Sequence, residues 1–180
     1  MADRAPDGAP MPRRRSGYRR IALELIVLAG FYSTVTTWQE RHLIRLHEAA
    51  PSFALDAIDG RQVSLASLRG KRVLVHFWAT WCGVCRREFG SLNAVNRGLA
   101  GDEALISIVA DSEDQEHVRR FVAEHEIQYP VLLGTNDVLR AFHVDTFPTN
   151  YFLDRNGAIA AHTIGMSTRM GLGSRLGCAK

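Results

Sequence analysis

The sequence predicts one α/β domain built on a mixed sheet flanked by helices, and three observations lead to this prediction. First, the apolar run 72–78 has the length and composition of a buried strand, and apolar residues at helical spacing follow it over 89–99. Second, strand and helix patterns continue to alternate beyond this helix. Third, apolar runs at 151–153 and 158–163 flank Asp154-Arg-Asn-Gly157, which indicates a closing hairpin. Together these features favour a sheet with parallel and antiparallel strand pairs.

Four elements are predicted between the first helix and the final hairpin. A second buried strand lies within 103–110, and Ser112-x-x-Gln115 has the pattern of a capping box for a helix that ends near His125. A short strand at 129–133 and a brief helix around 138–142 follow. A strand–helix pair between about 103 and 133 would fill the stretch between Cys82 and Pro148, which are 66 positions apart.

The two ends of the domain have weaker patterns. Residues 53–58 and 61–65 flank Asp59-Gly60 and predict an N-terminal β-hairpin with a two-residue turn. The C-terminal stretch 167–180 contains Gly171, Gly173 and Gly177, so we expect its helix to be short or frayed.

Charge is concentrated at the N-terminus. The 180 residues are 46% hydrophobic and carry a net charge of +3, which is typical of a globular chain. Residues 1–20 hold six arginines and two aspartates, a net +4, so the remaining residues carry −1. The basic excess therefore belongs to a tail and does not indicate a nucleic-acid-binding surface.

The chain is predicted to have four parts. Residues 1–18 form a disordered basic tail, 19–40 a transmembrane anchor helix, 41–50 a linker, and 51–180 the folded domain. The arginines before the apolar stretch predict that the N-terminus lies inside and the domain outside. Two alternatives remain open, a cleaved signal peptide and a soluble N-terminal helix.

The chemistry of the chain is predicted to reside in Cys82-Gly83-Val84-Cys85, at the turn from strand to helix. Cysteines three residues apart in a first helical turn lie on one face, within the Cα separation that a disulfide requires. The helix N-terminus stabilises a thiolate. We expect Cys82 to be the exposed nucleophile and Cys85 the buried resolving thiol.

Half of a zinc site is the alternative interpretation of this cysteine pair. A structural zinc ion needs four ligands, and the sequence offers only Cys178 and scattered histidines besides the pair. We therefore expect redox chemistry, with no metal and no cofactor.

The stretch Phe77-Trp-Ala-Thr-Trp-Cys-Gly-Val-Cys85 resembles the active site of the thioredoxin superfamily. It is most similar to the membrane-anchored, extracytoplasmic TlpA/ResA-like branch, which includes ScsD-type protein disulfide oxidoreductases. The resemblance covers roughly 50–166 and extends to Thr146-Phe147-Pro148-Thr149, where it implies a cis proline packed against the disulfide. It also implies a thioredoxin-like fold, and an active site lined by Trp81, Gly83, Val84, Phe147 and Pro148.

Two further residues have roles that the resemblance implies. Glu88 lies one helical turn after Cys85, where the TlpA/ResA branch often has a glutamate that handles protons at the resolving thiol, although Gly90 replaces the usual proline. His76 occupies the position of a buried acid in thioredoxins. The alternatives are a solvated charge for Glu88 and a satisfied polar residue for His76.

The sequence thus predicts a thiol-disulfide oxidoreductase that acts on protein disulfides or dithiols through Cys82 and Cys85. Its expected partners are protein substrates, a redox partner such as a membrane electron donor, and the bacterial inner membrane, with the N-terminus cytoplasmic and the domain periplasmic. A thiol peroxidase of the same fold is one alternative, but Ala79 replaces the activating threonine. A copper-binding module is the other, but its Cys-x₃-Cys spacing is missing.

Overall fold

The computed structural model describes residues 16–40 and 43–179, with side chains described for 20–34 and 43–179. The chain divides into two units, residues 1–41 and 42–180. The first contains helix α1 (Ser16–Glu40), and the second is the domain that holds all other elements. The expected disordered tail, residues 1–18, lies largely outside the described residues.

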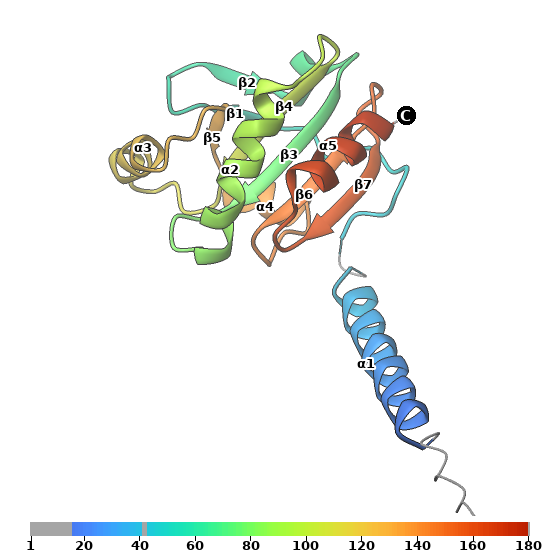
Figure 1. Ribbon diagram of the computed structural model, residues 1–180. Coiled ribbons are helices and arrows are strands. Elements are labelled where there is room, and N and C mark those ends of the chain that lie inside the picture. Colours follow the sequence, from blue (N-terminus) through green and yellow to red (C-terminus); the bar gives the residue numbers. More distant parts are fainter. Residues whose placement is uncertain (1–15, 41–42, 180) are drawn as a thin grey trace, which may run out of the picture. The chain divides into compact units, whose positions relative to one another are not determined.

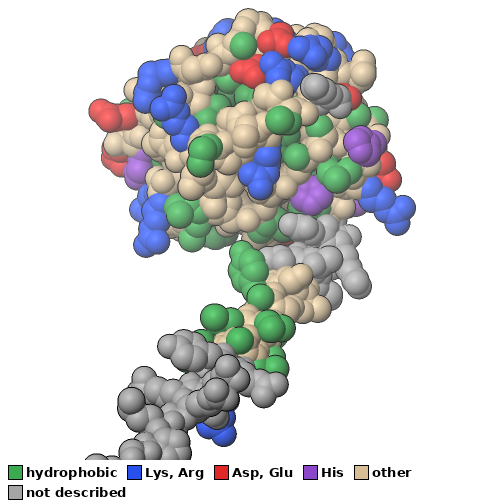
Figure 2. Space-filling view, turned by 45° about the vertical axis from the view of Figure 1, so that its right-hand side comes forward, with side chains coloured by type: hydrophobic (Ala, Val, Ile, Leu, Met, Phe, Trp, Pro, Cys, Tyr) green, Lys and Arg blue, Asp and Glu red, His purple; other side chains and the backbone are tan. Residues whose placement is uncertain are grey.

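Helix α1 covers the stretch that the sequence predicts to be a membrane anchor. Its apolar side chains between Ile21 and Tyr32 are exposed (Figure 2). Among the helices that the structure describes, none combines the length and the apolarity needed to cross a bilayer.

The domain is organised around a five-stranded mixed sheet with the order β5-β4-β3-β6-β7 (Figure 1). The central strand β3 (Arg72–Trp78) pairs in parallel with β4 (Glu103–Val109), which pairs in parallel with β5 (Val131–Leu133). On its other side β3 pairs antiparallel with β6 (Thr149–Leu153), and β6 pairs antiparallel with β7 (Ile159–Ile164). The predicted mixed sheet is confirmed.

Helices α2 (Gly83–Arg97) and α5 (Arg169–Cys178) lie side by side over one face of the sheet (Figure 1). The predicted amphipathic helix is confirmed in α2, which buries Phe89 and Leu92 against the sheet. Helix α5 has ten residues despite its glycines, because Leu172 and Leu176 are buried beside α2.

Helix α3 (Gln115–Glu124) connects β4 to β5, and helix α4 (Asn136–Ala141) connects β5 to β6. The predicted capping box for α3 is wrong. Asp114 caps the helix and accepts a hydrogen bond from the His117 N–H, whereas the Ser112 hydroxyl donates to the Gly134 carbonyl at 2.6 Å. Local spacing allows either Ser112 or Asp114 to cap the helix. The contact between Ser112 and Gly134 leaves Asp114 as the cap.

The N-terminal hairpin is confirmed but differs in register. Strands β1 (Ala54–Asp56) and β2 (Gln62–Ser64) are antiparallel, with Asp56 opposite Gln62. The Ala57 N–H donates to the Arg61 carbonyl at 2.7 Å, which leaves three residues in the turn instead of the predicted two. Gly60 has a φ of +84°, a conformation that favours glycine.

The segment 43–50 is not the linker that the sequence predicts. Leu43 and Ile44 are buried in the apolar core that also contains Phe53. The His47 N–H donates to the Ile159 carbonyl at 2.7 Å, so the segment runs beside β7. The folded domain therefore includes residues 43–50, and residues 41 and 42 lie outside the described ranges.

Candidate active site

The cysteine pair lies between β3 and α2, at the N-terminus of that helix. Cys82 is the N-cap residue, and its Sγ accepts a hydrogen bond from the Cys85 N–H at 3.1 Å. The two sulfurs form a disulfide with an S–S distance of 2.10 Å and a Cα–Cα separation of 5.3 Å. This places both sulfurs where the N–H groups and the dipole of α2 stabilise a negative charge.

The exposure of the two cysteines differs from the expected pattern. Cys82 is only 5% exposed and Cys85 is fully buried, so the prediction of an exposed Cys82 is wrong for this disulfide form. The cause is the cap position, which directs Sγ of Cys82 onto the helix end. The predicted order of exposure holds, because only Cys82 keeps accessible surface.

An apolar rim surrounds the cysteine pair. Trp81 is 67% exposed, and its ring packs edge-on against Phe147 with ring centroids 5.7 Å apart. The Phe147–Pro148 peptide bond is cis, as the resemblance implies, and Pro148 is buried. Gly83 and Val84 are exposed in the first turn of α2. The structure therefore brings all five predicted lining residues to this end of the molecule.

Sequence reasoning missed Met166, which is exposed near this rim. The preceding residue, Gly165, donates its N–H to the Pro148 carbonyl at 2.8 Å and has a φ of +81°. This contact holds the chain after β7 beside the cis proline. In the sequence, a glycine two residues after the predicted strand 158–163 is a signal for this turn.

Glu88 is buried beneath the active site and is not a solvated charge. Its Oε1 accepts hydrogen bonds from the Ser167 N–H at 2.8 Å and from Asn150 Nδ2 at 3.3 Å. Burial raises the pKa of Glu88 to about 7, although both hydrogen bonds act to lower it. A carboxyl group with a pKa near neutrality can accept or release a proton at physiological pH.

His76 lies on β3 below Glu88 and is fully buried. Its Nδ1 is 2.8 Å from Asn150 Oδ1 and 3.7 Å from Glu88 Oε2. Burial lowers the pKa of His76 to about 4, opposed by the hydrogen bond with Asn150. The imidazole is therefore neutral near pH 7. Sequence reasoning singled out His76 but missed Asn150, which directly precedes the apolar run 151–153.

Tyr129 also contributes to the environment of Glu88. It is 5% exposed, and among the described residues its hydroxyl has no hydrogen-bond partner. Burial and the charge of Glu88 raise the pKa of Tyr129 well above its usual value, so the phenol stays protonated.

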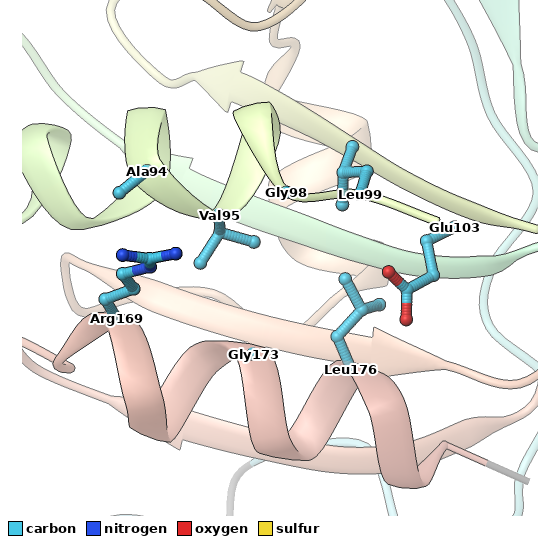
Figure 3. Close-up of a pocket in the computed structure, with 8 residues that line it drawn as sticks. All are labelled: Ala94, Val95, Gly98, Leu99, Glu103, Arg169, Gly173 and Leu176. Carbon is cyan, nitrogen blue, oxygen red and sulfur yellow. The ribbon is translucent and has the colours of Figure 1, made fainter. Parts of the chain in front are cut away.

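The remaining candidate features lie away from the cysteine pair. A groove of about 160 Å³ between α2 and α5 is lined by the second half of α2 and by residues such as Arg169 and Leu176 (Figure 3). Cys178 is a free, exposed thiol at the end of α5. Within the part of the chain that the structure describes, no group of three or more Cys, His, Asp or Glu side chains is arranged to hold a metal ion.

Comparison with known proteins places this geometry in a family. The AhpC/TSA family matches residues 46–162. The chain is 28% identical over 157 residues to the thioredoxin-like protein YneN of Bacillus subtilis, covering 84% of this chain and 92% of that protein. It is 28% identical over 162 residues to the thiol-disulfide oxidoreductase ResA of Geobacillus kaustophilus, covering 88% and 93% of the two chains.

The fold is shared with a solved structure. The crystal structure of a protein assigned as the thiol:disulfide interchange protein DsbE of Chlorobium tepidum has a TM-score of 0.68 and 26% identity. The similarity covers 74% of this chain and 96% of that one. Because the family match spans more than half of the chain, this protein belongs to the AhpC/TSA family, and within it is a thioredoxin-like thiol-disulfide oxidoreductase.

Proposed function

We propose that this oxidoreductase acts on protein disulfides and dithiols, with Cys82 as the nucleophile and Cys85 as the resolving thiol. The observation that carries the assignment is the difference in exposure, 5% for Cys82 and none for Cys85. This order of exposure supports Cys82 as the cysteine that exchanges with a sulfur of another protein. The N-cap position also favours the thiolate of Cys82.

In the reductive direction, the Cys82 thiolate attacks one sulfur of a substrate disulfide. A mixed disulfide forms, and the other substrate sulfur leaves as a thiolate. Cys85 then loses its proton and attacks Sγ of Cys82, which closes the Cys82–Cys85 disulfide and releases the second substrate thiolate. The substrate gains two electrons and takes up two protons, and a dithiol redox partner returns two electrons to the cysteine pair. Oxidation of a substrate dithiol follows the same steps in reverse.

Glu88 is the proposed acceptor of the Cys85 proton. A buried thiol has a raised pKa and needs a base to become a nucleophile. Glu88 is buried one helical turn beyond Cys85, and with a pKa of about 7 it is partly ionised at neutral pH. This combination of position and pKa supports the role.

Trapping of mixed disulfides tests the assignment of the cysteines. In a Cys178→Ser background, Cys85→Ser should accumulate mixed disulfides with protein substrates, because the resolving step is missing. Cys82→Ser should abolish both turnover and trapping. Equal trapping by the Cys82→Ser variant, detected on non-reducing gels with mass spectrometry, would reverse the two roles.

Peroxide turnover separates this function from the thiol peroxidase alternative. Ala79, three residues before Cys82, has no hydroxyl group to activate a peroxide. We therefore expect no peroxide consumption by the reduced chain beyond that of a small free dithiol. Rapid consumption without a protein disulfide would favour the peroxidase.

We also propose that residues 19–40 anchor the chain at the bacterial inner membrane, with the domain in the periplasm. The support is the arginine-rich sequence before this segment and the exposed apolar side chains of α1. Protease treatment of spheroplasts should then digest the domain. Recovery of the unprocessed full-length chain in the soluble fraction would contradict the anchor.

A further inference from the structure

A row of polar side chains crosses the sheet beneath α2. Ser107 on β4 lies opposite His76 on β3, His76 lies opposite Asn150 on β6, and Asn150 lies opposite Thr163 on β7. We call these four residues the polar rung. The first three are fully buried and Thr163 is half-buried. Burial of polar groups is costly unless each finds a partner, so the directions of their hydrogen bonds are informative.

Asn150 is the centre of these hydrogen bonds. Its Nδ2 donates to Glu88 Oε1 and to Thr163 Oγ1, each at 3.3 Å. Its Oδ1 faces Nδ1 of His76 at 2.8 Å. An amide oxygen only accepts, so Nδ1 of His76 must carry the hydrogen. The arrangement therefore requires the Nδ1–H tautomer, with the lone pair on Nε2, which has no partner among the described residues.

The two oxygens of Glu88 consequently have different environments. Oε1 receives two N–H donors, from Ser167 and Asn150. Oε2 is buried and receives no hydrogen bond within the described part of the chain. A proton added to the carboxyl group therefore belongs on Oε2, while the donors on Oε1 stabilise the ionised form.

We propose that His76 is a positioning residue for proton transfer at Cys85: its Nδ1–H fixes the orientation of Asn150, which then donates to Oε1 of Glu88. The inference rests on the proposed role of Glu88. Without the histidine donor, only the two 3.3 Å hydrogen bonds of Nδ2 orient the amide of Asn150, and its rotation places the oxygen against the carboxylate. The attraction between the Asn150 N–H and the Glu88 carboxylate is then replaced by a repulsion between two oxygens. This repulsion disfavours the ionised form of Glu88.

Among the described residues, the other titratable groups near Glu88 are Tyr129 and Cys85. The phenol of Tyr129, from the segment between α3 and β5, stays protonated, and Cys85 on α2 is the proposed proton donor. Asn150, Thr163 and Ser167 do not titrate. His76 itself is neutral above about pH 4, so it acts as a constant hydrogen-bond donor over the working range.

The test follows both half-reactions with an aromatic disulfide whose thiol product is coloured. The reduced full-length chain, as Cys178→Ser, releases one equivalent of thiol when Cys82 attacks and a second when Cys85 resolves. Stopped-flow measurements between about pH 5 and 9 give the pH dependence of each step. The range brackets the ordinary pKa values of histidine and cysteine, about 6.5 and 8.5.

In His76→Leu, resolution should be about tenfold slower at pH 7, the effect of one lost hydrogen bond to a charged group. Its pH midpoint should move upward, and attack by Cys82 should keep its rate. His76→Gln retains an N–H donor and should restore most of the rate. Wild-type resolution in His76→Leu at every pH would overturn the inference, as would a His76→Gln variant as slow as His76→Leu.

Nitrogen NMR of the wild-type chain provides a test that does not depend on the folding of a variant. We expect His76 to carry its hydrogen on Nδ1 from pH 8 down to about pH 5, since its pKa is about 4. The Nε2–H tautomer in the wild-type chain would overturn the inference.

Glu88→Gln separates this inference from the proposed function. If Glu88→Gln slows resolution while His76→Leu does not, the role of His76 fails and that of Glu88 stands. If Glu88→Gln resolves at the wild-type rate, the proposed role of Glu88 fails, and the role of His76 fails with it. The assignments of Cys82 and Cys85 are unaffected by either result.

Discussion

On the face of the sheet that points away from α2, the strands present apolar side chains such as Val75, Phe77 and Leu153. Tyr151 lies among them, and its hydroxyl is satisfied, donating to the Phe142 carbonyl at 2.7 Å. The face under α2 uses the intervening residues of the same strands and carries the polar rung, which contacts Glu88 on α2. This face also has an apolar core of its own, which includes Leu74, Trp78 and Phe152. The two faces therefore differ in the polar rung, which only this one carries.

Mutations on the face pointing away from α2 should change the stability of the fold and leave the redox chemistry unchanged. Phe77→Ala removes a fully buried ring whose centroid lies 5.1 Å from that of Phe142. We expect a loss of about 3–5 kcal/mol in the free energy of unfolding, measured with urea. The redox potential of the cysteine pair should stay unchanged. A clear shift in potential would break the separation between the two faces.

On the face under α2, Glu88 and His76 should make the free energy of unfolding depend on pH. The pKa of Glu88 rises from 4.5 to about 7 on folding, so its contribution to stability decreases as pH rises through this window. The pKa of His76 falls from 6.5 to about 4, so its contribution decreases as pH falls. Each effect amounts to about 3 kcal/mol over its whole window. Between pH 4.5 and 6.5 the two slopes oppose each other, and the oxidised wild-type chain should show little change.

Single variants at Glu88 and His76 should reveal separately how each residue makes the free energy of unfolding depend on pH. In Glu88→Gln only the histidine effect remains, and the free energy of unfolding should increase with pH. In His76→Gln only the carboxyl effect remains, and it should decrease with pH. Urea unfolding of the oxidised chain across this range measures both. Parallel curves for the two variants would show that this pair does not control the pH dependence.

The central strand and the helix that covers one face of the sheet were predictable from the sequence, because spacing alone identifies strand 72–78 and the helix that follows it. The cysteine pair and the cis proline were also predicted, since short motifs mark them. The contacts of Glu88 were not predicted from the sequence. Its partners Asn150 and Ser167 come from distant parts of the chain, and no local pattern reports which side chains meet across a sheet.

The corrections at the N-terminal side have a similar cause. Leu43 and Ile44 form a short apolar pair in an otherwise polar stretch, too short to indicate an element by periodicity. They are buried in the apolar core that also contains Tyr151, and the Ile44 N–H donates to the Tyr151 hydroxyl at 3.4 Å. Only the folded sheet creates that site.

The smallest expected effect concerns the rim, which belongs to neither face. Trp81→Ala removes a ring that is 67% exposed, and an aromatic contact between this ring and a protein substrate would contribute about 0.5–1.5 kcal/mol. We expect kcat/KM toward a protein disulfide to fall about two- to tenfold, while the reaction with a small aromatic disulfide is nearly unchanged. Equal losses with both substrates would instead place Trp81 in the chemistry of the cysteine pair.

The polar rung also has a consequence for how the strands find their alignment during folding. A slip of one residue between β3 and β6 would turn His76 or Asn150 toward the apolar face, where a polar group has no partner. Misaligned pairings therefore carry an added penalty of about 1–3 kcal/mol for each unsatisfied group. The residues that serve proton transfer in the finished protein thus also favour the correct strand alignment while the sheet assembles.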